Sequence, residues 1–235
     1  MIEWMLKQRR RKEFWLNTPG VNSVAVAELA MGLILSLARK IPLLDQSTKG
    51  GQWPRSTGME LANKTIGILG LGAIGKNLAR YAQGFSMKVI AYDPYINEEY
   101  AKENNITVAT FEQVIEASDV ISLHLPLNKD TKHLMNKEVI GKMKKGALLV
   151  NTSRGGLIDE EAAYEALKAG NLGGLGLDAF EVEPPTNSPL FELDHVIVTP
   201  HTGAHTKEAT EKMAELSIEN LINVLSNNEC KYLIN

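Results

Sequence analysis

The chain has 235 residues, of which 44% are hydrophobic and 23% are charged, and its formal net charge is −3. These ordinary globular values exclude the collagen-like, disordered and disulfide-framework classes of protein. The single cysteine, Cys230, cannot form a disulfide within the chain, and no apolar run approaches the roughly 20 residues of a membrane helix, so we expect a soluble, cytoplasmic protein.

The start of the chain is basic. Residues 1–40 carry seven basic and three acidic side chains, and the basic run KQRRRK occupies positions 7–12. Such a run can bind nucleic acid, but it is more often one solvated face of a helix. The rest of the chain is acidic and has no aromatic residues interleaved with basic ones, so we expect no nucleic-acid partner.

The next elements in chain order are a helix and a connection. Residues 22–40 predict one helix with Asn22 or Ser23 as its N-cap. Its long apolar face has little obvious use within the chain. Residues 42–60 are rich in Gly, Pro, Ser and Thr, which predicts a connection that carries a short helix.

From Leu61 onward, short β-rich runs alternate with amphipathic helical segments such as 73–85 and 159–170, and a last helix is predicted over 206–226. Several runs are almost continuous Val, Ile and Leu, as expected for strands covered on both faces. The pattern predicts an α/β fold with a doubly wound parallel sheet of the Rossmann type. The predicted strands are 65–70, 88–93, 106–109, 119–124, 147–152, 174–178 and 195–200.

A glycine-rich loop, GLGAIG, occupies positions 70–75 between a predicted strand and a predicted helix. In this context G-x-G-x-x-G indicates dinucleotide binding, because Gly70 permits a tight turn, Gly72 lets the backbone approach a pyrophosphate and Gly75 lets helix and strand pack closely. The amides near Ala73 and Ile74 would then face the phosphates at the helix start. The alternative is a cluster of glycines that serves only helix packing.

Asp93 ends the second predicted strand, 23 residues after Gly70. An acid at this place hydrogen-bonds the adenosine ribose and repels a 2′-phosphate, so we predict NAD rather than NADP as the cofactor. The alternative interpretation is a turn residue before Pro94.

Residues suited to ligand binding follow the predicted strands at their carboxyl ends, where ligands bind to open parallel sheets. Six strands contribute to this edge, which is hard to attribute to turn composition alone. The residues are Gly70, Asp93, His124, Thr152, Ser153, Arg154, Asp178 and His201.

Three side chains at or near this edge, those of Arg154, Glu183 and His201, suggest proton and hydride chemistry. His201 could exchange the proton of a hydroxyl group, Glu183 could orient its imidazole, and Arg154 could hold a substrate carboxylate. Each has an alternative role: His201 could cap the last helix, Glu183 could be a solvated loop acid, and Arg154 could form a structural ion pair.

The remaining histidines do not indicate a metal site. His133 and His205 are expected on the surface, and His195 is expected at the start of a strand, on the wrong edge for chemistry. His201 and His205 lack a third ligand at a sensible spacing, so we predict no metal site.

Seven motifs together resemble the NAD-dependent D-2-hydroxyacid dehydrogenases, especially the D-3-phosphoglycerate dehydrogenase branch. The resemblance runs from about Asn17 to Asn235. The motifs are NTPGVNSVAVAELA (17–30), GILGLGAIGKNLA (67–79), AYDPY (91–95), DVISLHLPLN (119–128), NTSRGGLIDE (151–160), GLDAFEVEPP (176–185) and TPHTGAHTKEA (199–209).

The resemblance implies roles for individual residues. It assigns Arg154 to the substrate carboxylate, His201 to proton transfer and Glu183 to pairing with that histidine. It places Asp178 at the nicotinamide carboxamide. The remaining implied cofactor contacts are Leu125, Thr152, Ser153 and Gly203. Ala73 departs from the family's usual arginine, which removes a possible pyrophosphate contact, and Thr202 and His205 also replace more common residues.

The resemblance also implies a domain organisation. We expect a poorly matching segment over 1–21, an NAD-binding domain with its N-terminal helix over 22–205, and a C-terminal helix and tail over 206–235. We expect the family's second, substrate-binding domain to be largely absent, because the chain enters the family pattern only after it.

The expected function is hydride transfer between NAD and a small D-2-hydroxy or 2-keto acid, most similar to 3-phosphoglycerate, with weak or no turnover by this chain alone. The alternative is an NAD-binding module without turnover. The family's dimers use helices that flank the nucleotide domain, so a homodimer is expected.

Overall fold

The computed structural model describes residues 15–226, 229–230 and 232–234, so the basic run at 7–12 lies outside the described residues. Contacts divide the chain into two units. One comprises the described residues up to Asn22 together with those from His205 onward, and the other comprises Ser23–Ala204. The larger unit contains the whole sheet and is described first.

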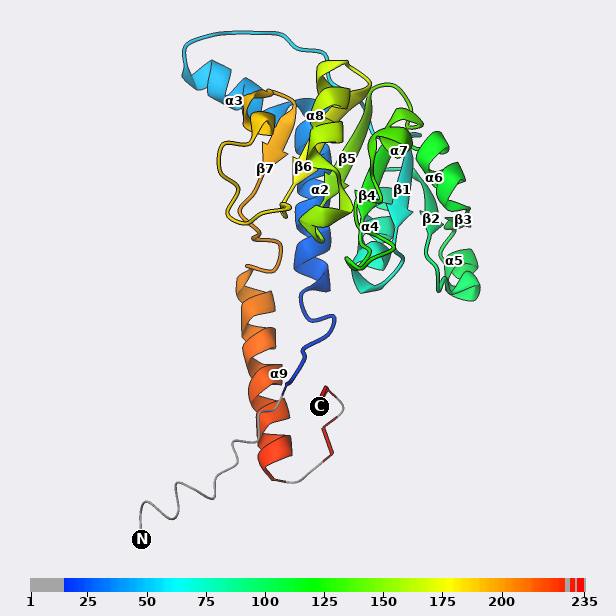
Figure 1. Ribbon diagram of the computed structural model, residues 1–235, viewed down its shortest axis with the longest axis vertical. Coiled ribbons are helices and arrows are strands. Elements are labelled where there is room, and N and C mark those ends of the chain that lie inside the picture. Colours follow the sequence, from blue (N-terminus) through cyan, green and yellow to red (C-terminus); the bar gives the residue numbers. More distant parts are fainter. Residues whose placement is uncertain (1–14, 227–228, 231, 235) are drawn as a thin grey trace. The chain divides into compact units, whose positions relative to one another are not determined.

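The sheet has seven parallel strands in the order β3-β2-β1-β4-β5-β6-β7 (Figure 1). This arrangement confirms the predicted doubly wound α/β fold. The buried apolar runs that predicted the strands form its centre, where every residue of β4 and β5 is buried. The strands are β1 (Thr65–Leu69), β2 (Lys88–Tyr92), β3 (Thr107–Val108), β4 (Val120–Leu123), β5 (Ala147–Asn151), β6 (Leu172–Leu177) and β7 (Val196–Val198).

Helices cover both faces of the sheet (Figure 1). Helices α2 (Ser23–Arg39) and α4 (Ala73–Gly84) share one hydrophobic cluster, and α6 (Phe111–Ala117), α7 (Lys137–Gly141) and α8 (Glu160–Lys168) share the other. The shorter elements are α3 (Ile41–Lys49), α5 (Glu98–Glu103) and the 3-10 turns η1 (Gly155–Leu157) and η2 (Pro189–Glu192).

Helix α2 corrects one expectation. Most of its apolar side chains are buried within the domain, because it packs against α4 and against strands β5 and β6. Two glycines of β6 make this possible: a side chain on Gly174 or Gly176 would press against Leu37 or Leu33 of the helix. The apolar face of α2 is therefore part of the core, and the inference of a free face on this helix is wrong.

The strand register aligns the carboxyl ends of five strands. Tyr92, Leu69, Leu123, Asn151 and Leu177 are successive partners across the sheet. The residues that follow them therefore form one row along the carboxyl edge, as the sequence predicted. This row is Asp93, Gly70, His124, Thr152 and Asp178.

The smaller unit contains α9 (Lys207–Leu225), whose N-cap is Thr206, with its hydroxyl accepting a hydrogen bond from the Ala209 N–H. Within this unit Leu16 and Leu233 form an antiparallel bridge, and the buried Asn220 donates to the carbonyl of Asn17. Over the described ranges, no helix combines the length and apolar character that crossing a membrane requires.

Candidate active site

The glycine loop has the geometry that its sequence predicted. Gly70 has φ +102°, a conformation that L side chains rarely adopt, and a Cβ there would meet the carbonyl group of His124. A Cβ on Gly75 would collide with the carbonyl oxygen of Gly70, whereas the space beside Gly72 is open. The loop thus allows close approach to its backbone at one position and close helix packing at another.

The start of α4 leaves its backbone donors available. Helices α5 to α9 all have an N-cap side chain that accepts a hydrogen bond from the first turn, whereas α4 has Gly72 as its N-cap and no such bond. The first N–H groups of a helix attract anions when no side chain satisfies them. The amides near Ala73 and Ile74 are therefore free to face a phosphate.

Asp93 lies directly against this loop. Its Oδ2 accepts a hydrogen bond from the Leu71 N–H (2.7 Å), and its Oδ1 accepts one from the Tyr95 N–H (2.8 Å). A carboxylate has four lone-pair sites, so two remain for further donors such as ribose hydroxyls. The structure thus brings together the glycine loop and the acid that the sequence paired with it.

Two buried polar atoms on the carboxyl edge have no partner. Among the residues described, Nδ1 of His124 and Oγ1 of Thr152 are buried side-chain atoms that make no hydrogen bond. Buried polar atoms are rarely left unsatisfied, so an orphaned pair beside a glycine loop indicates a place where a polar ligand binds. Together with the open space at Gly72, they fit a bound dinucleotide.

His124 itself was not expected to have this environment. Its Nε2 hydrogen-bonds Oγ of Ser122 (2.9 Å) on the same strand face, and burial lowers its pKa to about 4. It is therefore neutral at physiological pH.

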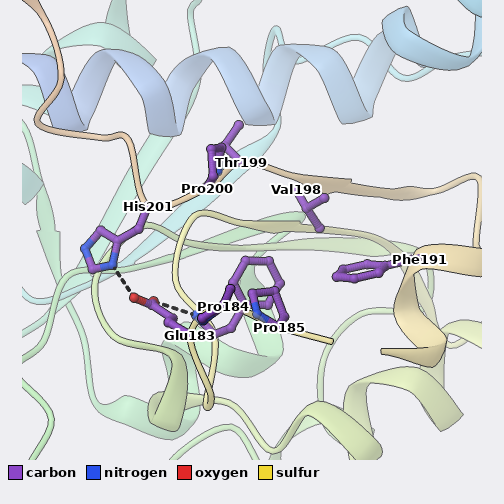
Figure 2. Close-up of a pocket in the computed structure, with 9 residues that line it drawn as sticks. Glu183, Pro184, Pro185, Phe191, Val198, Thr199, Pro200 and His201 are labelled. Atoms are coloured by element: carbon purple, nitrogen blue, oxygen red, sulfur yellow. Dashed lines mark hydrogen bonds and ion pairs between the residues drawn. The ribbon is translucent and has the colours of Figure 1, made fainter. Parts of the chain in front are cut away.

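His201 and Glu183 form a close pair (Figure 2). Nδ1 of His201 donates to Oε2 of Glu183 at 2.8 Å, and Oε1 of Glu183 accepts from the Phe180 N–H at 3.1 Å. The hydrogen bond from His201 is the main cause that lowers the pKa of Glu183, and the Phe180 N–H and the charge of Arg154 act in the same direction. Glu183 is thus exposed but held by two hydrogen bonds.

The backbone at His201 is strained. Its φ is +51°, in the left-handed region, and its N–H donates to the carbonyl of Thr199. Non-glycine residues in this region cost about 1–3 kcal/mol and cluster at functional sites. The N-cap of α9 is Thr206, so the alternative role of His201 as the helix cap is wrong.

Asp178 fixes the loop that carries His201. Its buried carboxylate accepts hydrogen bonds from Thr199 Oγ1 (2.6 Å), from the Thr202 N–H (2.8 Å) and from the Gly203 N–H (2.8 Å). Three donors on one buried carboxylate hold the backbone on both sides of His201. This brings Asp178 and Gly203, two residues expected near the nicotinamide, into direct contact.

Arg154 is exposed, and Nη1 donates to the carbonyl of Ser153. Within the described ranges it forms no ion pair, which argues against the purely structural role that the sequence left open. The loop around it is well ordered by hydrogen bonds: Asn151 Nδ2 donates to the Arg154 carbonyl, and Ser153 Oγ donates to the Leu123 carbonyl. A fixed backbone thus presents a guanidinium group that remains able to bind an anion.

An apolar pocket of about 480 Å³ lies beside the Glu183–His201 pair (Figure 2). Its walls include Pro184, Pro185, Phe191 and Val198, so one side of the pair is bordered by hydrophobic groups. The described part of the chain contains no group of three His, Cys, Asp or Glu side chains placed to hold a metal ion.

The contact between His133 and Glu181 was not predicted from the sequence. His133 was expected on the surface, but it is half-buried and its Nε2 lies 3.0 Å from Oε2 of Glu181. The two residues are 48 positions apart, and no local pattern links them. His205 is exposed, as predicted, and His195 precedes β7 at the opposite end from the site.

Comparison with known proteins identifies the family. The profile described as "D-isomer specific 2-hydroxyacid dehydrogenase, NAD binding domain" matches residues 31–203. The chain is 44% identical over 223 residues to the D-3-phosphoglycerate dehydrogenase of Methanocaldococcus jannaschii, an alignment that covers 94% of this chain and 43% of that protein. It is 46% identical over 215 residues to the hydroxypyruvate reductase of Thermotoga maritima, with 89% of this chain and 69% of that protein covered.

A solved structure of a dehydrogenase is also similar to this chain. The D-lactate dehydrogenase of Aquifex aeolicus, complexed with NAD and lactic acid, superposes with a TM-score of 0.85 at 30% identity, covering 97% of this chain and 73% of that one. The chain spans about two fifths of the length of the D-3-phosphoglycerate dehydrogenases that it matches. These similarities show that the chain belongs to the D-isomer specific 2-hydroxyacid dehydrogenases and carries the NAD-binding domain of that family.

Proposed function

We propose that this site transfers a hydride between the nicotinamide of NAD and C2 of a small D-2-hydroxy or 2-keto acid. The observation that carries the proposal is the hydrogen-bonded pair of His201 and Glu183 on the same domain as a dinucleotide-binding glycine loop. Bound NAD supplies the hydride acceptor in the oxidation and, as NADH, the donor in the reduction.

The cofactor would be held along the carboxyl edge of the sheet. The loop Gly70–Gly75 and the free amides of α4 would bind the pyrophosphate, and Asp93 would bind the adenosine ribose. The orphaned Thr152 hydroxyl is available for a further polar contact. The other proposed cofactor contacts are Leu125, Ser153, Arg154, Asp178, His201 and Gly203.

The hydrogen bond to Glu183 determines how His201 would work. Because Nδ1–H donates to Glu183, the neutral imidazole has its lone pair on Nε2, which can accept the proton of a substrate hydroxyl. The carboxylate of Glu183 then stabilises the imidazolium that results. In the reverse direction the same Nε2–H returns the proton to the carbonyl oxygen.

Arg154 would bind the carboxylate of the substrate. Its guanidinium forms no ion pair among the described residues, and it lies close enough to Glu183 for its charge to lower that residue's pKa. A guanidinium binds a carboxylate through two parallel hydrogen bonds, which fixes the orientation of the acid. The proton-transfer group and the carboxylate anchor thus belong to one small region.

The proposed substrate class resembles 3-phosphoglycerate. This proposal is supported by the similarity to D-3-phosphoglycerate dehydrogenases. The alignments cover less than half of the length of those proteins. The similarity to a hydroxypyruvate reductase keeps other small 2-keto acids as competing substrates.

We also propose a homodimer. The apolar face of α2 no longer supports it, but the segment after this helix does, because Ile41 and Trp53 are 52% and 80% exposed. Sedimentation measurements that show only a monomer at high protein concentration would count against the dimer.

The proposal is tested by two measurements on the chain. NADH fluorescence should increase on binding, and turnover of D-3-phosphoglycerate and of smaller 2-hydroxy acids should be screened in the wild type, in His201→Gln and in Arg154→Gln. No binding at millimolar NADH would contradict the cofactor site. Turnover that both variants retain would contradict the assigned residues.

A further inference from the structure

We propose that Glu181 is a positioning residue, which holds Glu183 in hydrogen-bonding contact with His201. It would do so by fixing the loop of residues 178–185 to the start of α8 and to His133. This inference rests on the proposed function of the Glu183–His201 pair. It assigns a role to three residues outside that pair, which are Glu181, Glu160 and His133.

Glu181 makes three hydrogen bonds to two different segments. Its Oε2 lies 3.0 Å from Nε2 of His133, and its Oε1 accepts from the Glu160 N–H at 3.3 Å. Its own N–H donates to Oε1 of Glu160 at 2.8 Å. The bonds between Glu181 and Glu160 are reciprocal, since each backbone N–H is bonded by the carboxylate of the other residue.

The segments that hold Glu181 are themselves fixed. The His133 N–H donates to the carbonyl of Gly156 at 2.7 Å, and His133 has φ +49°. Helix α8 begins at Glu160, so the Glu160 N–H is one of the first-turn donors that need a partner outside the helix. Glu181 therefore contacts groups that have little freedom to follow it if it moves.

The loop backbone next to Glu181 packs closely against Gly155. Gly155 packs so tightly that a Cβ there would overlap the carbonyl group of Phe180. The Phe180 N–H donates to Oε1 of Glu183, which leaves Oε2 for His201. Two residues before Glu183, the loop is thus held by the packing of Gly155 on Phe180 and by the three bonds of Glu181.

The arrangement brings two acidic side chains close together and offsets the electrostatic cost with hydrogen bonds. Burial raises the pKa of Glu160; the hydrogen bond from the Glu181 N–H lowers this pKa, and the charge of Glu181 raises it by less. The two neighbouring carboxylates repel each other, and two backbone N–H donors and His133 compensate for the repulsion. An uncharged pair would connect the loops without this cost.

The direction in which the pKa of Glu183 changes distinguishes a positioning role of Glu181 from a purely electrostatic effect of its charge. Removing the negative charge of Glu181 would by itself lower the pKa of Glu183, because repulsion of its carboxylate decreases. Loss of positioning would instead raise the pKa of Glu183, because the hydrogen bond from His201 is the main cause that lowers it. The two effects therefore have opposite directions.

The experiment follows the Glu183 carboxyl carbon by ¹³C NMR during a pH titration of the 235-residue chain without nucleotide. The resonance is assigned by its absence in Glu183→Gln. Glu181→Ala removes all side-chain bonds of Glu181, whereas Glu181→Gln removes the same charge and keeps an amide of nearly the same size. His201→Ala is the reference for loss of the pair, and Glu161→Gln removes an exposed charge from the same turn of α8.

We expect His201→Ala to raise the pKa of Glu183 and Glu181→Ala to produce most of the same rise. Glu181→Gln should restore much of the wild-type value, and Glu161→Gln should leave it unchanged. Equal effects of Glu181→Ala and Glu181→Gln, or a fall in both, would overturn the positioning role. No effect of His201→Ala would instead contradict the Glu183–His201 pair on which the proposed function depends.

A second variant keeps the test decisive if Glu181→Ala does not fold, which thermal unfolding would reveal. His133→Asn suits the left-handed backbone at this position but is too short to reach Glu181. It should raise the pKa of Glu183 in the same direction. An unchanged pKa in a folded His133→Asn chain would overturn the part of the proposal that concerns His133.

Discussion

The buried histidine on the carboxyl edge makes a quantitative prediction about stability and pH. Burial lowers the pKa of His124 from 6.5 to about 4, so the unfolded chain binds a proton there in a pH range where the folded chain does not. Stability rises with pH wherever the unfolded state binds more protons. The contribution of His124 is therefore unfavourable at acid pH and disappears as the pH rises through 6.5.

The size of the effect follows from the shift. One pKa unit corresponds to about 1.4 kcal/mol. Between about pH 8 and pH 5 the folded chain should lose on the order of 2 kcal/mol of unfolding free energy through this residue alone. The full shift limits the loss to about 3 kcal/mol at lower pH.

Urea denaturation at the two pH values, without nucleotide, measures this loss. His124→Asn has no titrating ring, so the pH dependence of its unfolding free energy should be weaker than that of the wild type by about 2 kcal/mol over this range. His205→Asn removes an exposed histidine and should keep the wild-type dependence. Equal pH dependence in wild type and His124→Asn would refute the reasoning that the ring is neutral because it is buried.

Other changes test the rest of the site. Asp178→Asn should lower the free energy of unfolding by about 2–4 kcal/mol, because an amide cannot accept all three hydrogen bonds of the buried carboxylate. The control Asp194→Asn, which changes an exposed residue before β7, should have little effect in the same thermal melts. Gly70→Ala should abolish NADH binding, since its φ of +102° and the carbonyl of His124 leave no place for a Cβ; fluorescence titration with unchanged affinity would contradict this. Asp93→Ser should increase the affinity for NADPH relative to NADH by about tenfold, or about 1.4 kcal/mol, and an unchanged ratio of dissociation constants would remove the argument for NAD preference. The pKa of Glu183 is lowered below 4.5, so its hydrogen bond to His201 stabilises the fold above pH 4.5 and is lost as the pH falls through the lowered pKa. The difference in Tm between wild type and Glu183→Gln should therefore shrink as the pH falls through that range.

Features that depend on local sequence were predicted well. The buried strands were visible as apolar runs, and their ends placed Gly70, Asp93, Thr152 and Asp178 in one row, which the register confirms. The parallel sheet does this automatically, because all its strands finish at the same edge.

Element boundaries followed the caps and edges of the fold. The strand predicted over 106–109 contracts to Thr107–Val108, because Ile106 turns into the core and the two strand residues are exposed at the sheet edge. The short helix α6 had a local signal in its capping box, Thr110 with Gln113, which would have located it.

Features that depend on tertiary packing could not be predicted. Nothing local shows that α2 packs against the glycines of β6, because those contacts join residues more than a hundred positions apart. The bond between His133 and Glu181 and the unpartnered Nδ1 of His124 likewise exist only in the folded chain. The sequence therefore located the candidate catalytic groups but not the residues that support them.

His201, the proposed proton-transfer residue, follows β7, and this position determines how the site would be lost on heating. Strand β7 has only three residues, ends the strand order of the described sheet and is hydrogen-bonded to β6 alone. Amide groups on such a strand exchange with solvent through local opening, at a lower free energy than global unfolding. Detachment of this strand would separate His201 from the nucleotide-binding part while the central strands remain intact. Loss of the catalytic arrangement would then precede loss of the fold during heating, and hydrogen exchange at Ile197 and Thr199, whose N–H groups face β6, would report it first.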